Sequence, residues 1–485
     1  MRLTNTLAGE VQDFEPPEPG TVGLYVCGVT PYAEAHVGHA MSAIVYDVFV
    51  RYLRWKGNPH GGLVVTYVTN YTDIDDKLIE RGHELGRDPL DLAQENIARW
   101  EREQQALNLI PPNVRPRVTE EIESIVNLIE RIIDNDHAYA TAEGNVYYRV
   151  QSKDDYGKLS HRQVDQMLTG TRFEPGDDKE FALDFSLWKA TKPGEPSWGS
   201  PWGEGRPGWH IECSAMAQRY LGDEFDIHGG GLDLVFPHHE NEIAQSEAAN
   251  TGFARIWMHN GLVQLGGEKM AKSVGNVTTV EEALTEWGPN ALRLAILGSH
   301  YHSPTTLSDD VLAAANSGGE RLRTALREAP EGGEPEPDTA QRETFIEAME
   351  DDLATPRALA VLFDLARVIN SGRDAGHDVR EAQGTLRELA EVLGLRLDDA
   401  PAAKLDAARL AAVVGDPVFP YNGDIPDQST SMSALEVIVE SLVANRETAR
   451  SQKEFALADQ IRDALAEAGV EIEDTADGPR WTARA

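Results

Sequence analysis

The chain has 485 residues, of which 41% are hydrophobic and 26% are charged, the composition of a folded protein with a large core. It contains no run of about 18 apolar residues and no basic segment followed by an apolar one at its N-terminus, so we predict neither a membrane span nor a secretory signal. The two cysteines, Cys27 and Cys213, lie far apart in the chain. In a protein expected to be cytoplasmic, this favours metal ligation or simple burial over a disulfide.

The formal net charge of −37, from 81 acidic and 44 basic residues, argues against a general affinity for nucleic acid. Net charge describes solubility and long-range fields, however, and does not exclude a local binding site. The acidic residues are spread over the whole length, and most of the basic residues are arginine. An evenly acidic, lysine-poor surface suits a protein in very high salt, where the Debye length is only about 3 Å at 1 M. We therefore hypothesise a salt-loving host.

The N-terminal part predicts an α/β fold. Residues 21–28 read as a short buried strand, and apolar residues at helical spacing predict a helix over 37–57. A second strand is expected at 63–69 and a second helix at 71–85. A strand–helix–strand unit of this kind begins a parallel, doubly wound sheet.

The alternation of strands and helices is interrupted by residues 116–200, which we interpret as an insertion. It is expected to contain a helix at 120–137 and a strand at 146–148. The alternation then returns in four further elements. They are a strand at 225–228, a helix that opens at Pro237, a strand near 255–265 and a helix over 277–300.

Beyond residue 305 the pattern becomes helical. Apolar residues recur at helical spacing in four segments, 306–328, 341–350, 355–371 and 379–394. The acidic stretch 329–339 is expected to be a solvated loop, and the proline-rich stretch 414–432 a linker. The last part, 433–485, predicts two helices and a hairpin-like end.

Two histidines lie where the first strand gives way to the long helix. His36 and His39 are three residues apart, on one face of the helix start, with Gly38 between them. A helix N-terminus offers free N–H groups and a positive dipole end, and a glycine lets a flat ring approach the backbone. The group suits the phosphates and base of ATP, although an ordinary pair of surface or core histidines would look the same.

Two lysines lie in a later loop that glycines flank. Lys269 and Lys272 fall within the run EKMAKS, residues 268–273, in a chain that is otherwise poor in lysine. Lysines in such a loop offer point charges for phosphate oxygens, but an ordinary solvated loop would have the same composition.

A third group combines cysteine, histidine and glutamate. Cys27 ends the first strand, Cys213 lies in the run GWHIEC, and His238 and Glu242 lie four residues apart in the run PHHENE. Such donors suit four-coordinate zinc. His239 is a rival for the histidine position, and two buried free thiols beside a polar helix start remain an alternative.

Taken together, the first two groups resemble the two signature motifs of class I aminoacyl-tRNA synthetases, in the right order around an inserted domain. Ala271 stands where that loop motif usually has serine, which removes a hydroxyl but neither lysine. The runs YVCG, NYTDIDDK, GRPGWHIECSAM, FDIHGGGLDL and FPHHENEIAQSE resemble those of the cysteinyl-tRNA synthetases in particular. The resemblance extends from about residue 20 to the end, and with the acidic composition it suggests a halophilic archaeal source.

The resemblance implies an ATP-dependent ligation of L-cysteine to tRNA(Cys) through a cysteinyl-adenylate. One Zn²⁺ per chain would be held by Cys27, Cys213, His238 and Glu242, and Mg²⁺ would accompany ATP. His36 and His39 on one side and Lys269 and Lys272 on the other would hold the triphosphate and act in catalysis. Other residues at matching positions are, for ATP, Gly38, Gly229, Gly230 and Gly231; for the substrate cysteine, Thr72, Trp209 and Asp233; and for the anticodon, Arg450, Phe455, Asp459 and Asp474.

The resemblance also implies the architecture: a Rossmann-like α/β catalytic domain with an inserted domain, then an all-α helix bundle and a small C-terminal anticodon-binding module. The expected division is 1–115 with 201–264 for the split catalytic domain, 116–200 for the insertion, 265–304 for the linking region with the lysine loop, 305–413 for the bundle, 414–432 for a linker and 433–485 for the module. The family implies a monomer. A cysteine ligase of the mycothiol pathway, a non-catalytic paralogue and a structural zinc protein are the competing interpretations.

Overall fold

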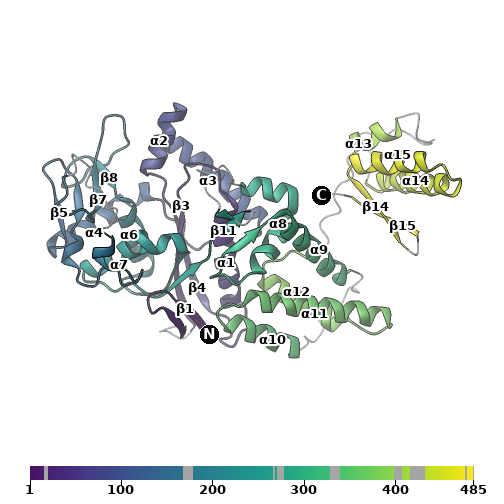
Figure 1. The fold of residues 1–485 in the computed structure, drawn as a ribbon, viewed down its shortest axis with the longest axis horizontal. Helices are drawn as coiled ribbons and strands as arrows, with labels where there is room; N and C mark the ends of the chain where they lie inside the picture. The colour runs from purple at the N-terminus through teal and green to yellow at the C-terminus, as the bar shows by residue number, and fades with distance from the viewer. Residues whose placement is uncertain are drawn as a thin grey trace. The chain divides into compact units, whose positions relative to one another are not determined.

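The computed structural model divides the chain into two compact units, Met1–Arg396 and Leu397–Ala485 (Figure 1). The structure describes residues 1–15, 20–167, 178–265, 268–269, 278–327, 339–397, 407–415, 432–475 and 478–483. Within these ranges, no helix combines the length and the apolar character that crossing a membrane requires.

A four-stranded parallel sheet forms the centre of the first unit, which confirms the expected α/β fold. Its strands are β3 (Thr21–Val29), β4 (Val64–Tyr71), β9 (Phe225–Gly231) and β10 (Ala254–Asn260), in the spatial order β10-β9-β3-β4. β3 lies between β9 and β4 in the register that places Tyr25 beside both His228 and Val68. Helices cover the faces of such a sheet, and ligands bind at the carboxyl ends of its strands.

The helices that follow β3 and β4 begin at recognisable caps. α1 (Val37–Arg54) begins at His36, whose side chain accepts a hydrogen bond from the Gly38 amide. α2 (Asp76–Leu85) begins five residues later than predicted because β4 extends to Tyr71 and the Asp75 side chain caps the helix.

Three N-terminal elements were not predicted. α3 (Pro89–Ala106) has Asp88 as its N-cap and Pro89 in its first turn, which are usual signals of a helix start. The strands β1 (Arg2–Asn5) and β2 (Glu10–Asp13) form an antiparallel pair.

The insertion is a small α/β body. It contains α4 (Ile122–Asp134) and an antiparallel sheet in the order β5-β6-β7-β8 (Figure 1). These strands are Ala138–Ala140, Val146–Tyr148, Phe185–Ala190 and Gly205–Pro207. The short helix α5 spans Val164–Met167.

Two helices return the chain to the sheet. α6 (Trp209–Leu221) follows β8, and α7 (Glu240–Ala248) follows β9. The predicted helix after Pro237 is present, but it begins at Glu240 because Val235–His239 form a separate π-helical turn before it. The buried Glu240 carboxylate accepts hydrogen bonds from the backbone of Gly157 and Ser160, at 3.0 and 2.8 Å, so α7 also anchors the insertion.

The predicted strand 255–265 is divided at Gly261. A side chain there would place its Cβ 2.1 Å from the Ser303 carbonyl oxygen, so only glycine fits. After the break, β11 (Val263–Leu265) pairs with β12 (Glu268–Lys269) and β13 (Thr305–Leu307).

The helical part of the first unit confirms the four predicted helical segments, which follow α8 (Val280–Leu297). They are α9 (Asp309–Leu326), α10 (Thr339–Glu350), α11 (Thr355–Asp374) and α12 (Arg380–Val392). α8 is tied to the sheet domain by Arg293, which is completely buried and pairs with Asp47 of α1. The same guanidinium donates to the carbonyl oxygens of Leu107, Asn108 and Leu393.

The second unit packs α13 (Ala407–Val414) with α14 (Met432–Ser451), α15 (Phe455–Glu467) and the hairpin β14–β15, Val470–Thr475 and Gly478–Ala483. Leu410 and Val413 of α13 belong to the core of this unit, whereas the predicted division placed them in the helix bundle. Most of the expected linker, 416–431, and the loop 329–338 lie outside the described residues.

A buried carboxyl group on α3 generates a prediction about pH. Glu103 is 6% exposed and neither carboxylate oxygen has a hydrogen bond within the described chain. Burial, and then the charge of Glu281, raise the pKa of Glu103 to about 7. The folded chain therefore binds a proton that the unfolded chain releases from about pH 4.3 upward, and stability falls as pH rises through this window.

Glu103→Gln should remove this pH dependence. Relative to the native chain, we expect the free energy of unfolding to change little at pH 5 and to rise by on the order of 1–2 kcal/mol at pH 8. Urea unfolding at the two pH values measures the difference, with the exposed Glu80→Gln as control. An equal effect of Glu103→Gln at both pH values would contradict the assignment.

Candidate active site

Four side chains with metal-binding atoms meet at the carboxyl edge of the central sheet. Cys27 comes from β3, Cys213 from α6, His238 from the π-helical turn and Glu242 from α7. The donor atoms all lie within 4.8 Å of one another. The Cys27 Sγ is 3.5 Å from both the Cys213 Sγ and the Glu242 Oε1. The fold thus brings together the four residues that the sequence proposed as ligands, and both cysteines are free thiols.

A second set of donors overlaps the first. Cys27 and Glu242 also lie within 4.8 Å of donor atoms of His228 and His239. The His239 Nε2 is 3.3 Å from the Cys27 Sγ, and the His238 Nε2 is 3.2 Å from the Glu242 Oε1. The geometry therefore keeps His239 as a rival of His238 and adds His228, the residue before the glycine run 229–231.

Each of the two rival histidines is oriented by another histidine that the sequence analysis missed. His238 shares a 3.0 Å contact between Nδ1 atoms with His210, and the His239 Nδ1 lies 2.7 Å from the His259 Nε2. The Trp209 ring stacks on His238 at 4.3 Å between centroids. His210 was visible in the run GWHIEC, but its partnership with His238 arises only in the fold.

Burial sets the protonation of the cluster. It lowers the pKa of His238 and His239 well below the usual value, helped by neighbouring histidines, so both are neutral imidazoles that can bind a metal. Burial, then the hydrogen bond with Cys213, raise the pKa of Cys27. For Cys213, the hydrogen bond from Cys27 lowers the pKa, but burial and Glu242 outweigh it and the net shift is upward.

The donor set fits a zinc ion. The Glu242 side chain is completely buried, and its Oε2 has no hydrogen bond among the described residues. An ionised buried carboxylate is costly unless a cation or donors offset it. Two sulfurs, an imidazole and a carboxylate are the ligand types of four-coordinate zinc, which also keeps cysteine ligands ionised.

A cleft of about 390 Å³ opens beside this cluster. Cys27 and Trp209 line it near the donor atoms, and His36 and His39 line it at the start of α1. The two histidine rings stack at 3.9 Å between centroids, and the His36 amide donates to the His39 Nδ1 at 3.1 Å. The cleft therefore joins the candidate metal cluster to a helix N-terminus.

The segment after the lysine loop returns to the start of α1. The Val37 amide donates to the Thr278 carbonyl and the Val280 amide to the Ala35 carbonyl, and His36 forms an isolated bridge with Thr279. Before the loop, Lys269 of β12 pairs through its backbone with Gln264 of β11. Lys272 and Ala271 lie outside the described residues, but the backbone on both sides of their segment is thus held near the cleft.

The three residues expected to touch the amino acid occupy different positions. Asp233 and Trp209 line the cleft. Thr72 is buried behind its wall, where its hydroxyl donates to the Glu212 Oε2 at 2.9 Å. Burial, then Asp75, raise the pKa of Glu212 well above the usual value.

The glycines expected near ATP also differ in whether they line the cleft. Gly38 and Gly231 line the cleft, whereas Gly229 and Gly230 do not belong to its lining. A Cβ on Gly229 would lie 2.5 Å from the Tyr46 ring, and one on Gly230 would lie 2.8 Å from the His239 ring. Close packing explains glycine at these two positions.

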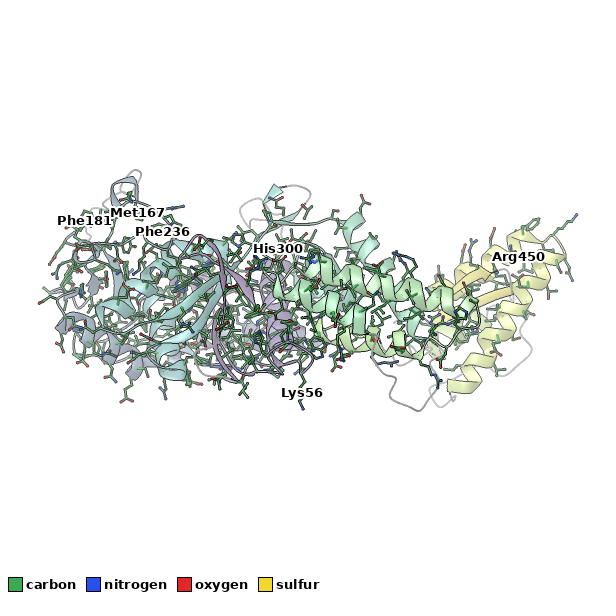
Figure 2. The ribbon with its side chains drawn as sticks, turned by 90° about the horizontal axis from the view of Figure 1, so that it is seen from below. Lys56, Met167, Phe181, Phe236, His300 and Arg450 are labelled. Atoms are coloured by element: carbon green, nitrogen blue, oxygen red, sulfur yellow. The ribbon has the colours of Figure 1, made fainter. Side chains whose placement is uncertain are left out.

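The four expected anticodon residues belong to the second unit. Arg450, labelled in Figure 2, lies on α14 and pairs with Glu447 at 3.2 Å. Phe455, at the start of α15, is 60% exposed, and Asp459 pairs with Arg462 at 3.0 Å. Asp474 lies in β14, and its side chain is outside the described part of the molecule.

Comparison with known proteins identifies three matching family models. They are described as a catalytic domain of class I tRNA synthetases, matched by residues 13–317; a DALR domain, by 344–398; and a cysteinyl-tRNA ligase anticodon-binding domain, by 432–481.

Curated relatives match along the whole chain. The protein named cysteine–tRNA ligase is 45% identical in Dehalococcoides mccartyi strain BAV1 and 48% identical in Halorhodospira halophila, with 99% of each chain covered in both comparisons. These relatives are bacterial, so the expected archaeal source is not supported.

Solved structures show the same fold. A Mycobacterium tuberculosis methionyl-tRNA synthetase with methionyl-adenylate has a TM-score of 0.56 at 17% identity and covers 77% of this chain and 89% of its own. A leucyl-tRNA synthetase from Agrobacterium radiobacter in a ternary complex has a TM-score of 0.53 at 12% identity and covers 79% of this chain and 84% of its own.

Substitution can separate the two overlapping donor sets. If His238 is the ligand, His238→Ala should weaken zinc affinity by at least about 100-fold, whereas His239→Ala, which removes an orienting neighbour, should cost about 10-fold. Chelator competition on each purified variant measures this. The reverse order would assign the position to His239.

Proposed function

The chain belongs to the cysteinyl-tRNA synthetase family, and on that premise we propose that it joins L-cysteine to tRNA(Cys) through a cysteinyl-adenylate, with zinc selecting the amino acid by its thiol. The observation that supports selection by zinc is the Cys–Cys–His–Glu cluster, in which Cys27 lines the same cleft as the histidines of α1 and the other three side chains are buried.

Selection must distinguish cysteine from serine, which differ by one atom. Shape alone gives only about 1–3 kcal/mol for so small a difference. Zinc bound by Cys27, Cys213, His238 and Glu242 would favour a thiolate over an alcohol as its further ligand. Asp233, which lines the cleft, would bind the substrate amino group.

Activation needs no covalent nucleophile from the protein. A carboxylate oxygen of cysteine attacks the α-phosphorus of ATP, and the bond to pyrophosphate breaks. His36 and His39 would hold the phosphates at the α1 N-terminus, where N–H groups and the helix dipole favour anions. Lys269 and Lys272 would approach from the opposite side and stabilise the charge that develops, with Mg²⁺ on the ATP.

Transfer follows on the same adenylate. A terminal ribose hydroxyl of the tRNA attacks the cysteinyl carbonyl carbon, and AMP leaves. Anticodon recognition would fall to the second unit, since its described residues include the exposed Phe455 ring and the charged Arg450 and Asp459. Single-stranded bases are commonly bound by stacking and edge hydrogen bonds.

Two competing functions share the catalytic half. A mycothiol-pathway cysteine ligase would charge an amino sugar, but it typically lacks the C-terminal module that residues 432–481 match here. A non-catalytic paralogue or a structural zinc protein would not activate cysteine. Family resemblance also favours a cytoplasmic monomer, and the net charge of −37 favours activity in high salt.

The deciding experiment measures three properties of the full chain. About one zinc per chain, cysteine-dependent ATP–pyrophosphate exchange and charging of tRNA are expected, with serine inactive and a higher rate in molar potassium chloride than in dilute buffer. Exchange without charging would indicate another acceptor. Zinc without exchange would indicate a structural protein, and a low-salt optimum would refute only the salt proposal.

Lys272→Ala tests the role of the loop. Removing one charge from the phosphate-binding loop should lower kcat for ATP–pyrophosphate exchange by about 10²–10³-fold, while zinc content stays at the native level. Lys192→Ala, an exposed lysine of the insertion, serves as control. A native exchange rate in Lys272→Ala would remove this lysine from the mechanism.

Phe455→Ala tests the anticodon module. Loss of one stacking contact, worth about 1–3 kcal/mol, should raise KM for tRNA by about 5- to 100-fold. The rate of ATP–pyrophosphate exchange should be unchanged. The separate variant Phe455→Trp, which keeps an aromatic ring, should have a KM for tRNA close to the native value. Steady-state charging measures both variants, and an unchanged KM in Phe455→Ala would place the stacking surface elsewhere.

A further inference from the structure

Tyr25 is a buried phenol that the catalytic assignments leave unexplained. It lies in β3 two residues before Cys27, so the two side chains emerge on the same face of the sheet. The side chain is completely buried, and its ring stacks on His228 at 5.3 Å between centroids. Its position thus places it in the inner wall of the candidate metal cluster.

The hydroxyl of Tyr25 lacks an ordinary partner. Within the described chain its oxygen has no hydrogen bond of ordinary geometry, and the Cys213 thiol is the side chain close enough to interact with it. The groups that surround it are Cys213, Cys27 and Glu242, three of the four proposed ligands. A buried hydroxyl without a hydrogen bond costs roughly 1–3 kcal/mol, so its retention here calls for an acceptor.

Cys213 changes its hydrogen-bonding character when it binds a metal. As a thiol, it donates towards the Asn70 Oδ1, 3.8 Å from its Sγ. That oxygen also accepts from the Gly28 amide at 2.9 Å. A metal-bound cysteine has lost its proton to solvent, so its sulfur can only accept, and Asn70 Oδ1 cannot donate to it.

We propose that Tyr25 is a positioning residue whose hydroxyl donates a hydrogen bond to the Cys213 sulfur when zinc is bound. This inference rests on the proposed zinc site and adds a member to it. The donor holds the sulfur in place and withdraws charge from it, which leaves the metal a stronger acceptor for the substrate thiol. Outer-sphere donors of this kind commonly change metal affinity by 10–100-fold.

Tyr25→Phe, which removes one oxygen atom, tests the proposal in the full chain. Zinc affinity, measured by chelator competition with zinc alone, should fall by about 10-fold. In cobalt-substituted protein, the sulfur-to-cobalt charge-transfer band should move to lower energy, because the sulfur loses its hydrogen bond. KM for cysteine should rise more than kcat falls.

The matched control is Tyr148→Phe. Tyr148 is also completely buried, but its hydroxyl donates to the Ala244 carbonyl at 3.1 Å. This variant loses a buried hydrogen bond as well, and its zinc affinity and cobalt band should remain native. A change common to both variants would mean that the Tyr25 effect is one of general stability and would overturn the proposal.

Two further outcomes distinguish a failure of the Tyr25 proposal from a failure of the proposed zinc site. If the native chain binds zinc and Tyr25→Phe binds it equally tightly with an unshifted cobalt band, the Tyr25 proposal alone is wrong. If the native chain binds no zinc at all, the proposed metal site is wrong and the role of Tyr25 falls with it.

Discussion

The arrangement of the catalytic unit depends on the close approach of two thiols, an imidazole and a carboxylate, all of them buried except Cys27, which lines the cleft. Such a group is unstable in a protein interior unless a cation offsets the charge, because an unpaired buried carboxylate is costly. Glu242, completely buried with one oxygen lacking a hydrogen bond, expresses this constraint most directly. Four elements, β3, α6, the π-helical turn Val235–His239 and α7, have to meet at the same point for the contact to exist.

The histidines around the cluster hold its side chains in their orientations. His210 and His259 each contact the Nδ1 atom of one of the adjacent pair His238 and His239, which leaves the Nε2 atoms facing Glu242 and Cys27. An orienting hydrogen bond of this kind selects the tautomer and the ring direction of a ligand. The selection proposed for this pocket, between two amino acids that differ by one atom, would need a rigid wall, and the Trp209 ring stacks on His238 there.

The side of the cleft at the start of α1, where we propose that phosphates bind, is held from two directions. The bridge between His36 and Thr279 joins the start of α1 to the segment after the lysine loop. Deeper in the unit, the buried pair Arg293–Asp47 joins α8 to α1 again. Thr278 and Thr279, which follow the lysine loop, are therefore paired with the start of the helix whose N-terminus would receive the phosphates.

The sequence by itself determined the parallel sheet and the four helical segments, because strand and helix periods are local properties. Its resemblance to a known family proposed the candidate ligands, with His239 left as a rival of His238. The sequence did not determine that α7 begins at Glu240, that α3 exists or that α13 packs with the last unit, since caps, turns and core packing decided these. Only the tertiary structure brought Cys27 and Cys213, 186 positions apart, to a sulfur–sulfur distance of 3.5 Å. It also placed Tyr25 and the histidine pairs around them, because contacts between distant segments depend on how elements pack, and no local pattern records that.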